Sequence, residues 1–324
     1  MGNKILITGA TGFIGSYLTN RLSINNEVTV LDNNFRGNLN NISSKTQKKI
    51  KIIKGDIRNY KLVENSLKNN DIVIHLAFIN GTSHFYKNPG LVLDVGITGT
   101  LNIIKAINSK KNRVKKFLFA SSSEIYQTPK KIPTNEKAEG LVPDINNPRY
   151  SYGSSKLIGE ILTIHMLNKK VKKIIFRPHN IYGPRMGNLH VIPQLILKIK
   201  KKMLNKNIKL KIQGSGNETR SFCYINDAID AINILINKGK NKEIYNIGSQ
   251  KEISINKLIK LIAFKLKKKI KIIKKSLAKG STKRRCPDIK KIKKLGFYPK
   301  ISLSEGLDKT IDYYINKIKW NSYP

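Results

Sequence analysis

The sequence predicts a doubly wound α/β fold with a parallel sheet, followed by a smaller and mainly helical second domain. Three observations support this. Short β-branched runs alternate with amphipathic helical patterns through the first 177 residues, a glycine-rich stretch joins the first run to the first helix, and helical patterns dominate after Pro178. We therefore expect one domain over residues 1–177, with a later return of the chain near 222–248, and a second domain over residues 178–324.

The first domain is predicted from six strands with amphipathic helices between them, of which three are the clearest. The strands are expected at Lys4–Thr8, Glu27–Asp32, Lys51–Lys54, Asp71–Leu76, Lys116–Ser121 and Lys173–Arg177, and the helices at Tyr60–Lys68, Leu91–Asn108 and Tyr152–Leu167. Beyond Pro178, helices are expected at Val191–Leu204, Asp227–Asn237, Ile255–Leu266 and Ser304–Ile315, with short strands at Leu210–Gln213 and Glu243–Ile247.

The composition limits the class of protein. The 324 residues carry 62 Lys and Arg against 20 Asp and Glu, a net charge of +42. These charges are scattered, and the densest clusters, 198–211 and 265–275, contain apolar residues at helix or strand spacing. We therefore expect amphipathic elements and a solvated basic surface that attracts anionic ligands, in preference to a dedicated nucleic-acid face.

Compartment and metal content are predicted from what the sequence lacks. Cys223 and Cys286 fit no metal-ligand spacing and are expected to be reduced thiols in a cytoplasmic protein, without a bound metal. No uninterrupted run of about 18 apolar residues and no signal-peptide pattern is found, so we expect no membrane partner.

The segment ITGATGFIGS, residues 7–16, places Gly9, Gly12 and Gly15 three residues apart between the first strand and the first helix. In a βαβ unit the first glycine permits a tight turn, the second lets the backbone approach a pyrophosphate, and the third lets the helix pack on the strand. The helix N-terminus adds free N–H groups and a favourable dipole. The segment therefore predicts a Rossmann-like dinucleotide site, and the alternative is an ordinary strand-to-helix turn.

Asp32 ends the second strand, 23 residues after Gly9. A carboxylate at this position accepts hydrogen bonds from an adenosine ribose and repels a 2′-phosphate, which favours NAD over NADP. Arg36 lies close by in the sequence and weakens that preference.

The segment YSYGSSK places Tyr152 and Lys156 four residues apart, on one face of the predicted helix. An ammonium group beside a phenol favours the phenolate and lowers its pKa, and a phenolate can accept a hydroxyl proton during oxidation by NAD. The end of the fifth strand adds Ser122, which could bind the reacting hydroxyl, and the carboxylate of Glu124. The alternatives are a surface pair for Tyr152 and Lys156 and a solvated loop acid for Glu124.

Taken together, these segments resemble the extended short-chain dehydrogenase/reductases that act on nucleotide sugars. The resemblance covers nearly the whole chain, and its motifs are the glycine triplet, Asp32, GDI at 55–57, HLA at 75–77, SSSEIY at 121–126, Tyr152-x-x-x-Lys156, RPHNIYGPR at 177–185, TRSFCYINDAIDAI at 219–232, NIG at 246–248 and RRCPDI at 284–289.

The resemblance implies a role for individual residues. The cofactor-binding positions it implies are Gly9, Thr11, Gly12, Phe13, Ile14, Gly15, Asp32, Asp56, Ile57, Leu76, Ala77, Tyr152 and Lys156. It makes Ser122, Tyr152 and Lys156 the catalytic residues, with Glu124 as an additional acid or base. It also implies that Ser123, His179, Asn180, Arg220 and Arg285 bind the substrate, Asn180 and Arg220 at its diphosphate.

The implied reaction begins with oxidation at C4 of the sugar to a 4-keto intermediate. Epimerases of this family then return hydride to the other face, whereas 4,6-dehydratases use a glutamate as base for the C5 proton. The segment Ser122-Ser123-Glu124 and the run from Arg285 to Asp288 also resemble UDP-glucuronate decarboxylases.

Three interpretations of function therefore stay open. They are an NAD-dependent nucleotide-sugar epimerase/dehydratase in surface-polysaccharide sugar synthesis, a UDP-glucuronate-type decarboxylase, and a basic nucleic-acid-binding protein on an inactive scaffold. The resemblance also implies a homodimer through the helices at 91–108 and 152–167, which sedimentation would test.

Two positions depart from the family pattern. Gly96 stands where an asparagine near the nicotinamide is usual, and Gln127 stands where a glycine is usual, so we expect a locally different cofactor pocket and a rearranged turn. His75 is expected to be a packed strand residue.

Overall fold

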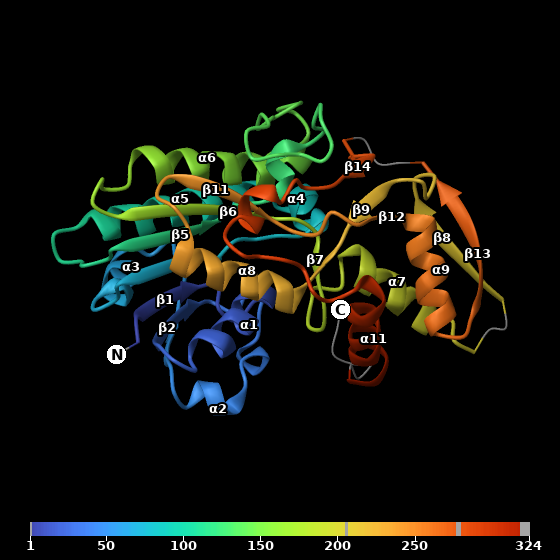
Figure 1. Cartoon of the computed structure of the whole chain (residues 1–324), viewed down its shortest axis with the longest axis horizontal. Helices are drawn as coiled ribbons and strands as arrows, with labels where there is room; N and C mark the ends of the chain where they lie inside the picture. Colours follow the sequence, from blue (N-terminus) through green and yellow to red (C-terminus); the bar gives the residue numbers. More distant parts are fainter. Residues whose placement is uncertain (1, 205–206, 277–279, 318–324) are drawn as a thin grey trace.

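The computed structural model describes residues 2–204, 207–276 and 280–317. Its largest element is a parallel seven-stranded sheet in the order β11-β6-β5-β4-β1-β2-β3 (Figure 1). The strands are β1 (Lys4–Thr8), β2 (Glu27–Asp32), β3 (Lys51–Lys54), β4 (Ile72–His75), β5 (Lys116–Ala120), β6 (Lys172–Pro178) and β11 (Glu243–Ile247). The strand order reverses between β1 and β4, which confirms the doubly wound Rossmann-like fold and places its ligand crevice at that reversal.

Helices cover both faces of this sheet (Figure 1). On one face α3 (Tyr60–Leu67) and α6 (Ser151–His165) pack against α5 (Pro89–Asn108), and on the other α1 (Phe13–Leu22) packs against α8 (Ile225–Lys238). Strand β1 contributes side chains to both hydrophobic cores. Ile5 and Ile7 belong to the core that includes α1 and α8, and Leu6 belongs to the core that includes α5. Successive side chains of a strand point to opposite faces of the sheet, so β1 packs against both helix layers.

Helix α5 was expected as an amphipathic helix and is the most apolar helix of the first lobe's described residues. Within the described residues it alone has the length and mean hydropathy of a membrane-crossing helix, because Asp94 and Lys105 are its only charged residues. More than half of that stretch is buried inside the fold, as in the core helix of a globular domain.

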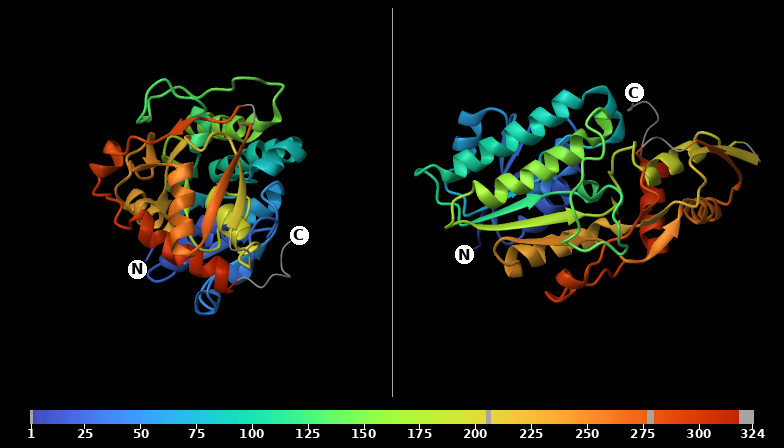
Figure 2. Two further views of the ribbon diagram at one scale, coloured as in Figure 1. Left: turned by 90° about the vertical axis from the view of Figure 1, so that its right-hand side faces the viewer. Right: turned by 90° about the horizontal axis from the view of Figure 1, so that it is seen from above.

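The second lobe extends beyond the carboxyl ends of the strands (Figure 2). It contains α7 (Val191–Lys200), α9 (Ile255–Lys265), α11 (Leu303–Asp312) and a parallel pair of strands, β8 (Asn207–Gln213) and β13 (Lys269–Lys275). A second small sheet has the order β12-β9-β14, from Glu252–Ser254, Thr219–Ser221 and Arg284–Arg285. The remaining elements are β7 (Ile181–Tyr182), β10 (Cys223–Tyr224), α2 (Ser44–Gln47), α4 (Thr82–Lys87), α10 (Lys290–Lys293), four-residue or shorter turns at Leu39–Asn41, Ser123–Tyr126 and Pro148–Tyr150, and a helical turn at Tyr313–Lys317.

The chain passes from one lobe to the other and back. After β6 it enters the second lobe, and through α8 and β11 it returns to the large sheet, where β11 pairs with β6. The return expected near 222–248 corresponds to this segment. The last part of the predicted second domain, residues 318–324, lies outside the described residues.

The two lysine-rich clusters form elements of the second lobe. In β8 the buried side chains Ile208, Leu210 and Ile212 alternate with the exposed Lys209 and Lys211. The alternation confirms an amphipathic strand at the end of the first cluster, because one face of β8 packs in the core while its lysines face solvent.

Candidate active site

A cavity of about 1300 Å³ runs along the carboxyl ends of the central strands and continues between the two lobes. Its wall includes Asp32 after β2, Ala77 after β4, Ser122 after β5 and Arg220 and Arg285 from the second lobe. This is the crevice in which open α/β sheets bind their ligands. The volume exceeds that of a usual single-ligand pocket, so the crevice has room for a dinucleotide and a second ligand.

The glycine loop shapes one end of this cavity. Gly9 has a φ of 73°, in the left-handed region that favours glycine. A Cβ atom on Gly15 would lie 2.1 Å from the Gly9 carbonyl oxygen, so only glycine lets α1 begin this close to β1. Gly12, Phe13 and Ile14 line the cavity at the N-terminus of α1, where backbone N–H groups lack partners within the helix. This loop therefore fits a dinucleotide diphosphate.

Two carboxylates lie where the adenosine part of a dinucleotide is expected. Asp32 accepts hydrogen bonds from the backbone N–H groups of Thr11 (2.9 Å) and Asn34 (2.8 Å), which ties the glycine loop to the end of β2. Asp56 pairs with Arg58 at 2.9 Å, and this hydrogen bond lowers the pKa of the Asp56 carboxyl. Both carboxylates line the cavity, whereas Thr11 is buried behind it.

The predicted catalytic residues come together at the end of β5. Tyr152, in the first turn of α6, lies beside Ser122, and both line the cavity. The Tyr152 ring stacks on Phe85 with the ring centroids 5.0 Å apart, which fixes the direction of the phenol. Two segments that are 30 residues apart in the sequence thus place a phenol and a hydroxyl where a substrate hydroxyl could bind to both.

Lys156 does not have the surroundings expected from the sequence. Its ammonium donates to the carbonyl oxygen of Ala120 and lies 3.0 Å from the centroid of the Phe78 ring. Burial lowers the pKa of Lys156 well below its usual value, and burial raises the pKa of Tyr152, which the neighbouring Ser122 hydroxyl only partly offsets. The predicted lowering of the phenol pKa by the ammonium is not found in this arrangement, because Lys156 directs its ammonium to Ala120 and Phe78 and desolvation dominates the pKa of Tyr152.

Glu124 is held by arginines. Its carboxylate lies 2.6 Å from Arg285, which also donates to Thr282. Burial alone would raise the pKa of Glu124, but the charge and hydrogen bond of Arg285, helped by Arg149 and Arg220, lower it to about 2. Such a carboxylate is a weak base, so Glu124 is poorly suited to remove a proton from carbon.

The predicted substrate residues are only partly brought together. Asn180, Ser123, Arg220 and Arg285 line the cavity, and Arg220 is fixed by hydrogen bonds to the carbonyl oxygens of Thr219 and Thr282. His179 is 1% exposed, does not line the cavity and hydrogen bonds to Asn246. Its expected contact with substrate is wrong, because β6 directs this side chain into the fold between β6 and β11.

Three further cavity residues were not assigned a site role from the sequence. Arg149 lies three residues before Tyr152, and its buried Nε has no partner among the described residues. Phe78 directly follows the HLA segment, and Arg36 follows Asp32 by four residues. Their closeness in sequence to recognised motifs was the available signal, and the direction of each side chain was not predictable.

Both departures from the family pattern have a structural counterpart. A Cβ on Gly96 would lie 2.8 Å from Ser155 Cβ and 3.0 Å from the edge of the Phe78 ring, so Phe78 occupies the space beside Gly96. The expected local difference of the cofactor pocket stays a prediction. Gln127 has a φ of 48°, so the backbone there keeps a left-handed conformation without the glycine that it favours.

Two remaining predictions concern histidine and metal. His75 is fully buried and bonded to Thr8 and Thr100, which confirms it as a packed strand residue. Within residues 2–204, 207–276 and 280–317, no three His, Cys, Asp or Glu side chains gather as a metal site requires.

Comparison with known proteins gives the same family. The NAD dependent epimerase/dehydratase family matches residues 5–248. The chain is 35% identical over 320 residues to a putative UDP-glucose 4-epimerase of Methanocaldococcus jannaschii, covering 96% of this chain and 98% of that protein. It is 32% identical to UDP-glucuronic acid decarboxylase 1 of Xenopus tropicalis, covering 98% of this chain and 73% of that protein.

Among solved structures, the UDP-glucose 4-epimerase of Thermotoga maritima with UDP-glucose superposes with a TM-score of 0.86 at 27% identity, covering 98% of this chain and all of that one. The glycine loop, Asp32 and the grouping of Ser122 with Tyr152 are thus set in a chain that is similar to these enzymes over its whole length. The chain belongs to the NAD-dependent epimerase/dehydratase family.

Proposed function

We propose that the protein is a nucleotide-sugar 4-epimerase that works through a 4-keto intermediate. The observation that carries the proposal is the phenol of Tyr152, which lies beside the Ser122 hydroxyl inside a cavity large enough for NAD and a nucleotide sugar. An epimerase needs a single proton-transferring group at C4 and no second base, which agrees with the groups available here.

The chain's own residues divide the work. Ser122 and Tyr152 hold the C4 hydroxyl. Tyr152 accepts the proton of this hydroxyl and returns it after the keto sugar has rotated to present its other face. Gly12, Phe13 and Ile14 would hold the cofactor diphosphate and Asp32 an adenosine ribose, while bound NAD takes up and gives back the hydride. Arg220 and Arg285 present guanidinium groups suited to a substrate diphosphate.

The environment of Glu124 favours epimerisation over 4,6-dehydration. A dehydratase requires a base for the C5 proton, and a carboxylate whose pKa is lowered to about 2 by Arg285 is a poor one. We therefore assign Glu124 the role of positioning Arg285 instead of a catalytic one.

A UDP-glucuronate-type decarboxylase is the second candidate. Three arginines, Arg149, Arg220 and Arg285, surround Glu124 close to Ser122, and together they exceed its single negative charge. Such a group could hold a carboxylate of the sugar, which agrees with the similarity to the decarboxylase of Xenopus tropicalis.

One experiment separates the candidates. The protein is incubated with NAD and, separately, UDP-glucose, UDP-galactose, UDP-N-acetylglucosamine and UDP-glucuronate, and products are identified by NMR. Interconversion of C4 epimers is expected, without release of CO2. Loss of CO2 from UDP-glucuronate without epimerisation would replace the proposal by its alternative, and a 4-keto-6-deoxy product would contradict both.

A Tyr152→Phe variant tests the assignment of the phenol. We expect turnover to fall by roughly 10²- to 10⁴-fold, as for loss of a general acid–base group, while NAD binding stays unchanged. The exposed Tyr86→Phe is the matched control and should keep full activity. Wild-type turnover in Tyr152→Phe would refute the mechanism.

The predicted place of this reaction, in the cytoplasm and in surface-polysaccharide sugar synthesis, stays part of the proposal. It is supported only by the substrate class of the family.

A further inference from the structure

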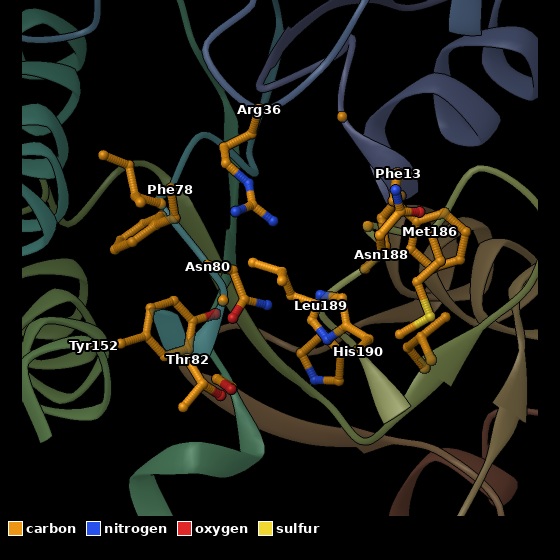
Figure 3. Close-up of a pocket in the computed structure, with 18 of the residues that line it drawn as sticks. Phe13, Arg36, Phe78, Asn80, Thr82, Tyr152, Met186, Asn188, Leu189 and His190 are labelled. Atoms are coloured by element: carbon orange, nitrogen blue, oxygen red, sulfur yellow. The ribbon is translucent and has the colours of Figure 1, made fainter. Parts of the chain in front are cut away.

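Arg36 reaches into the cavity from the loop after β2. Its Nη1 lies 3.1 Å from the position that a Cβ on Gly81 would take, and its Nη2 lies 3.3 Å from the corresponding position on Gly187. The two glycines come from opposite walls, Gly81 from the loop after β4 and Gly187 from the segment before α7. Figure 3 shows the guanidinium pointing into the space between Phe78 and Asn80 on one side and Asn188 on the other.

The guanidinium has no anionic partner. Within the part of the chain that the structure describes, Arg36 donates no hydrogen bond and forms no ion pair, and Asp32 is bonded instead to Thr11 and Asn34. The aromatic groups nearest to it, His84, His190 and Tyr152, carry no negative charge that would neutralise it. A half-buried cation without a partner is costly unless a ligand supplies the anion.

The position of Arg36 indicates which anion this is. In a dinucleotide the diphosphate joins the two riboses, so it lies between the adenosine end at Asp32 and the nicotinamide end at Tyr152. Arg36 is on the loop that follows Asp32. Tyr152 is close enough that its charge raises the pKa of Arg36. Across the cavity from Arg36 lies Phe13 (Figure 3), the first residue of α1, and Gly12, Phe13 and Ile14 line the cavity at this helix N-terminus.

We propose that Arg36 binds the diphosphate of NAD, opposite the N-terminus of α1. A guanidinium is suited to this because two of its N–H groups can donate to neighbouring phosphate oxygens. The same geometry removes the conflict between Asp32 and Arg36 in choosing the cofactor. Arg36 faces the middle of the cavity, so it is not placed to receive a 2′-phosphate beside Asp32.

Binding of cofactor fragments to the full chain tests this without any assay of catalysis. Calorimetry is carried out with NAD, ADP-ribose, adenosine and NADP on the wild type, Arg36→Gln and Arg36→Lys. Arg21→Gln is the matched control, because Arg21 is also a first-lobe arginine but is exposed and paired with Asp230. Circular dichroism and thermal unfolding verify that each variant is folded.

Arg36→Gln should weaken NAD and ADP-ribose roughly 10- to 100-fold, as for loss of a charged hydrogen bond, and leave adenosine unchanged. Arg36→Lys should fall between the wild type and Arg36→Gln, and Arg21→Gln should match the wild type. An equal loss of adenosine affinity would show a disturbed loop and overturn the proposal. So would unchanged NAD affinity with weaker UDP-glucose binding, or a loss specific to NADP.

Discussion

The phenol of Tyr152 is controlled by what surrounds it. Burial raises its pKa, the neighbouring Ser122 hydroxyl acts in the opposite direction, and Lys156 directs its ammonium to Ala120 and Phe78. At neutral pH the group is therefore protonated and can donate, whereas its action as a base requires loss of that proton. The rate of sugar oxidation should then be limited by the small fraction of phenolate.

This gives a prediction for the pH dependence. Because the phenolate fraction rises tenfold per pH unit below a raised pKa, kcat/KM for the first oxidation should increase with pH from 6 to 9 with a slope near one. The measurement is NADH formation under single-turnover conditions over that range, with pH jumps to verify that the enzyme is intact. A plateau that begins near pH 7 would instead show that Lys156 lowers the phenol pKa once ligands are bound.

Glu124 provides a second prediction for a single residue. Glu124→Gln removes a carboxylate that is a weak base but is the ion-pair partner of the buried Arg285. We expect epimerisation to change less than about fivefold, while the free energy of unfolding falls by about 1–3 kcal/mol, because Arg285 loses its charged partner. Steady-state kinetics and urea unfolding measure the two effects, and loss of all turnover at unchanged stability would restore Glu124 as a catalytic residue.

At the scale of elements, the close contact between α5 and α6 depends on glycine. A Cβ on Gly96 would lie 2.8 Å from Ser155 Cβ on α6, and neither helix can give way through a flexible side-chain end. Gly90 lies in the same helix, and a Cβ there would have nothing within 4 Å. The two glycines therefore differ in their packing within one helix.

Substitution by alanine should separate them. Gly96→Ala gains helix propensity but overpacks the contact with Ser155 and Phe78, so we expect a net loss of about 1–2 kcal/mol in the free energy of unfolding. Gly90→Ala should leave stability unchanged or raise it by up to about 1 kcal/mol. Urea unfolding of both variants gives the comparison, and equal effects would mean that the helix contact has room to spare.

The sequence predicted most elements because their patterns are local. The strands at 4–8, 27–32 and 51–54 have the predicted bounds, since short β-branched runs between turns have few alternatives. The segment that forms β13 was expected only as an amphipathic element at helix or strand spacing, and its pairing with β8 had no local signal. Pairs such as β7 with β10 are too short to leave any pattern.

In the site, too, local motifs were predicted and contacts between distant segments were not. Tyr152, Ser122 and Asp32 were found because their spacing carries the chemistry. The inward direction of His179 depends on Asn246, 67 residues away, and the direction of Lys156 depends on Phe78. Contacts between distant segments have no local signal in one sequence. The side-chain directions of His179 and Lys156 are therefore known only from the structure.

At the scale of the whole molecule, the net charge of +42 is carried mostly outside the core. The apolar sides of β8 and α9 pack inward while their lysines face solvent, as expected of amphipathic elements. One ion pair is buried inside the fold, between Glu160 and Arg177, which lie 2.6 Å apart. Buried titratable groups make the stability depend on pH.

Three of these groups are histidines that the fold keeps neutral. Burial lowers the pKa of His75 and His179 to about 3, and desolvation lowers that of the half-buried His190, which lines the cavity, to about 4. In the unfolded chain each has an ordinary value near 6.5. Below that pH the unfolded state binds protons that the native state does not, so the stability present above pH 6.5 is lost as the pH falls towards 4.

The expected slope is large enough to measure. Each histidine contributes roughly 1.4 kcal/mol per pH unit below 6.5, so three should lower the free energy of unfolding by about 4 kcal/mol per unit between pH 6 and 5. Urea unfolding at half-unit intervals measures this, in a range where most carboxylates are ionised in both states. His179→Gln should reduce the slope by about one third, because one of three protons is no longer taken up on unfolding. A stability that is constant from pH 7 to 5 would contradict this prediction. It would mean that these histidines are protonated in the folded protein as readily as in the unfolded chain.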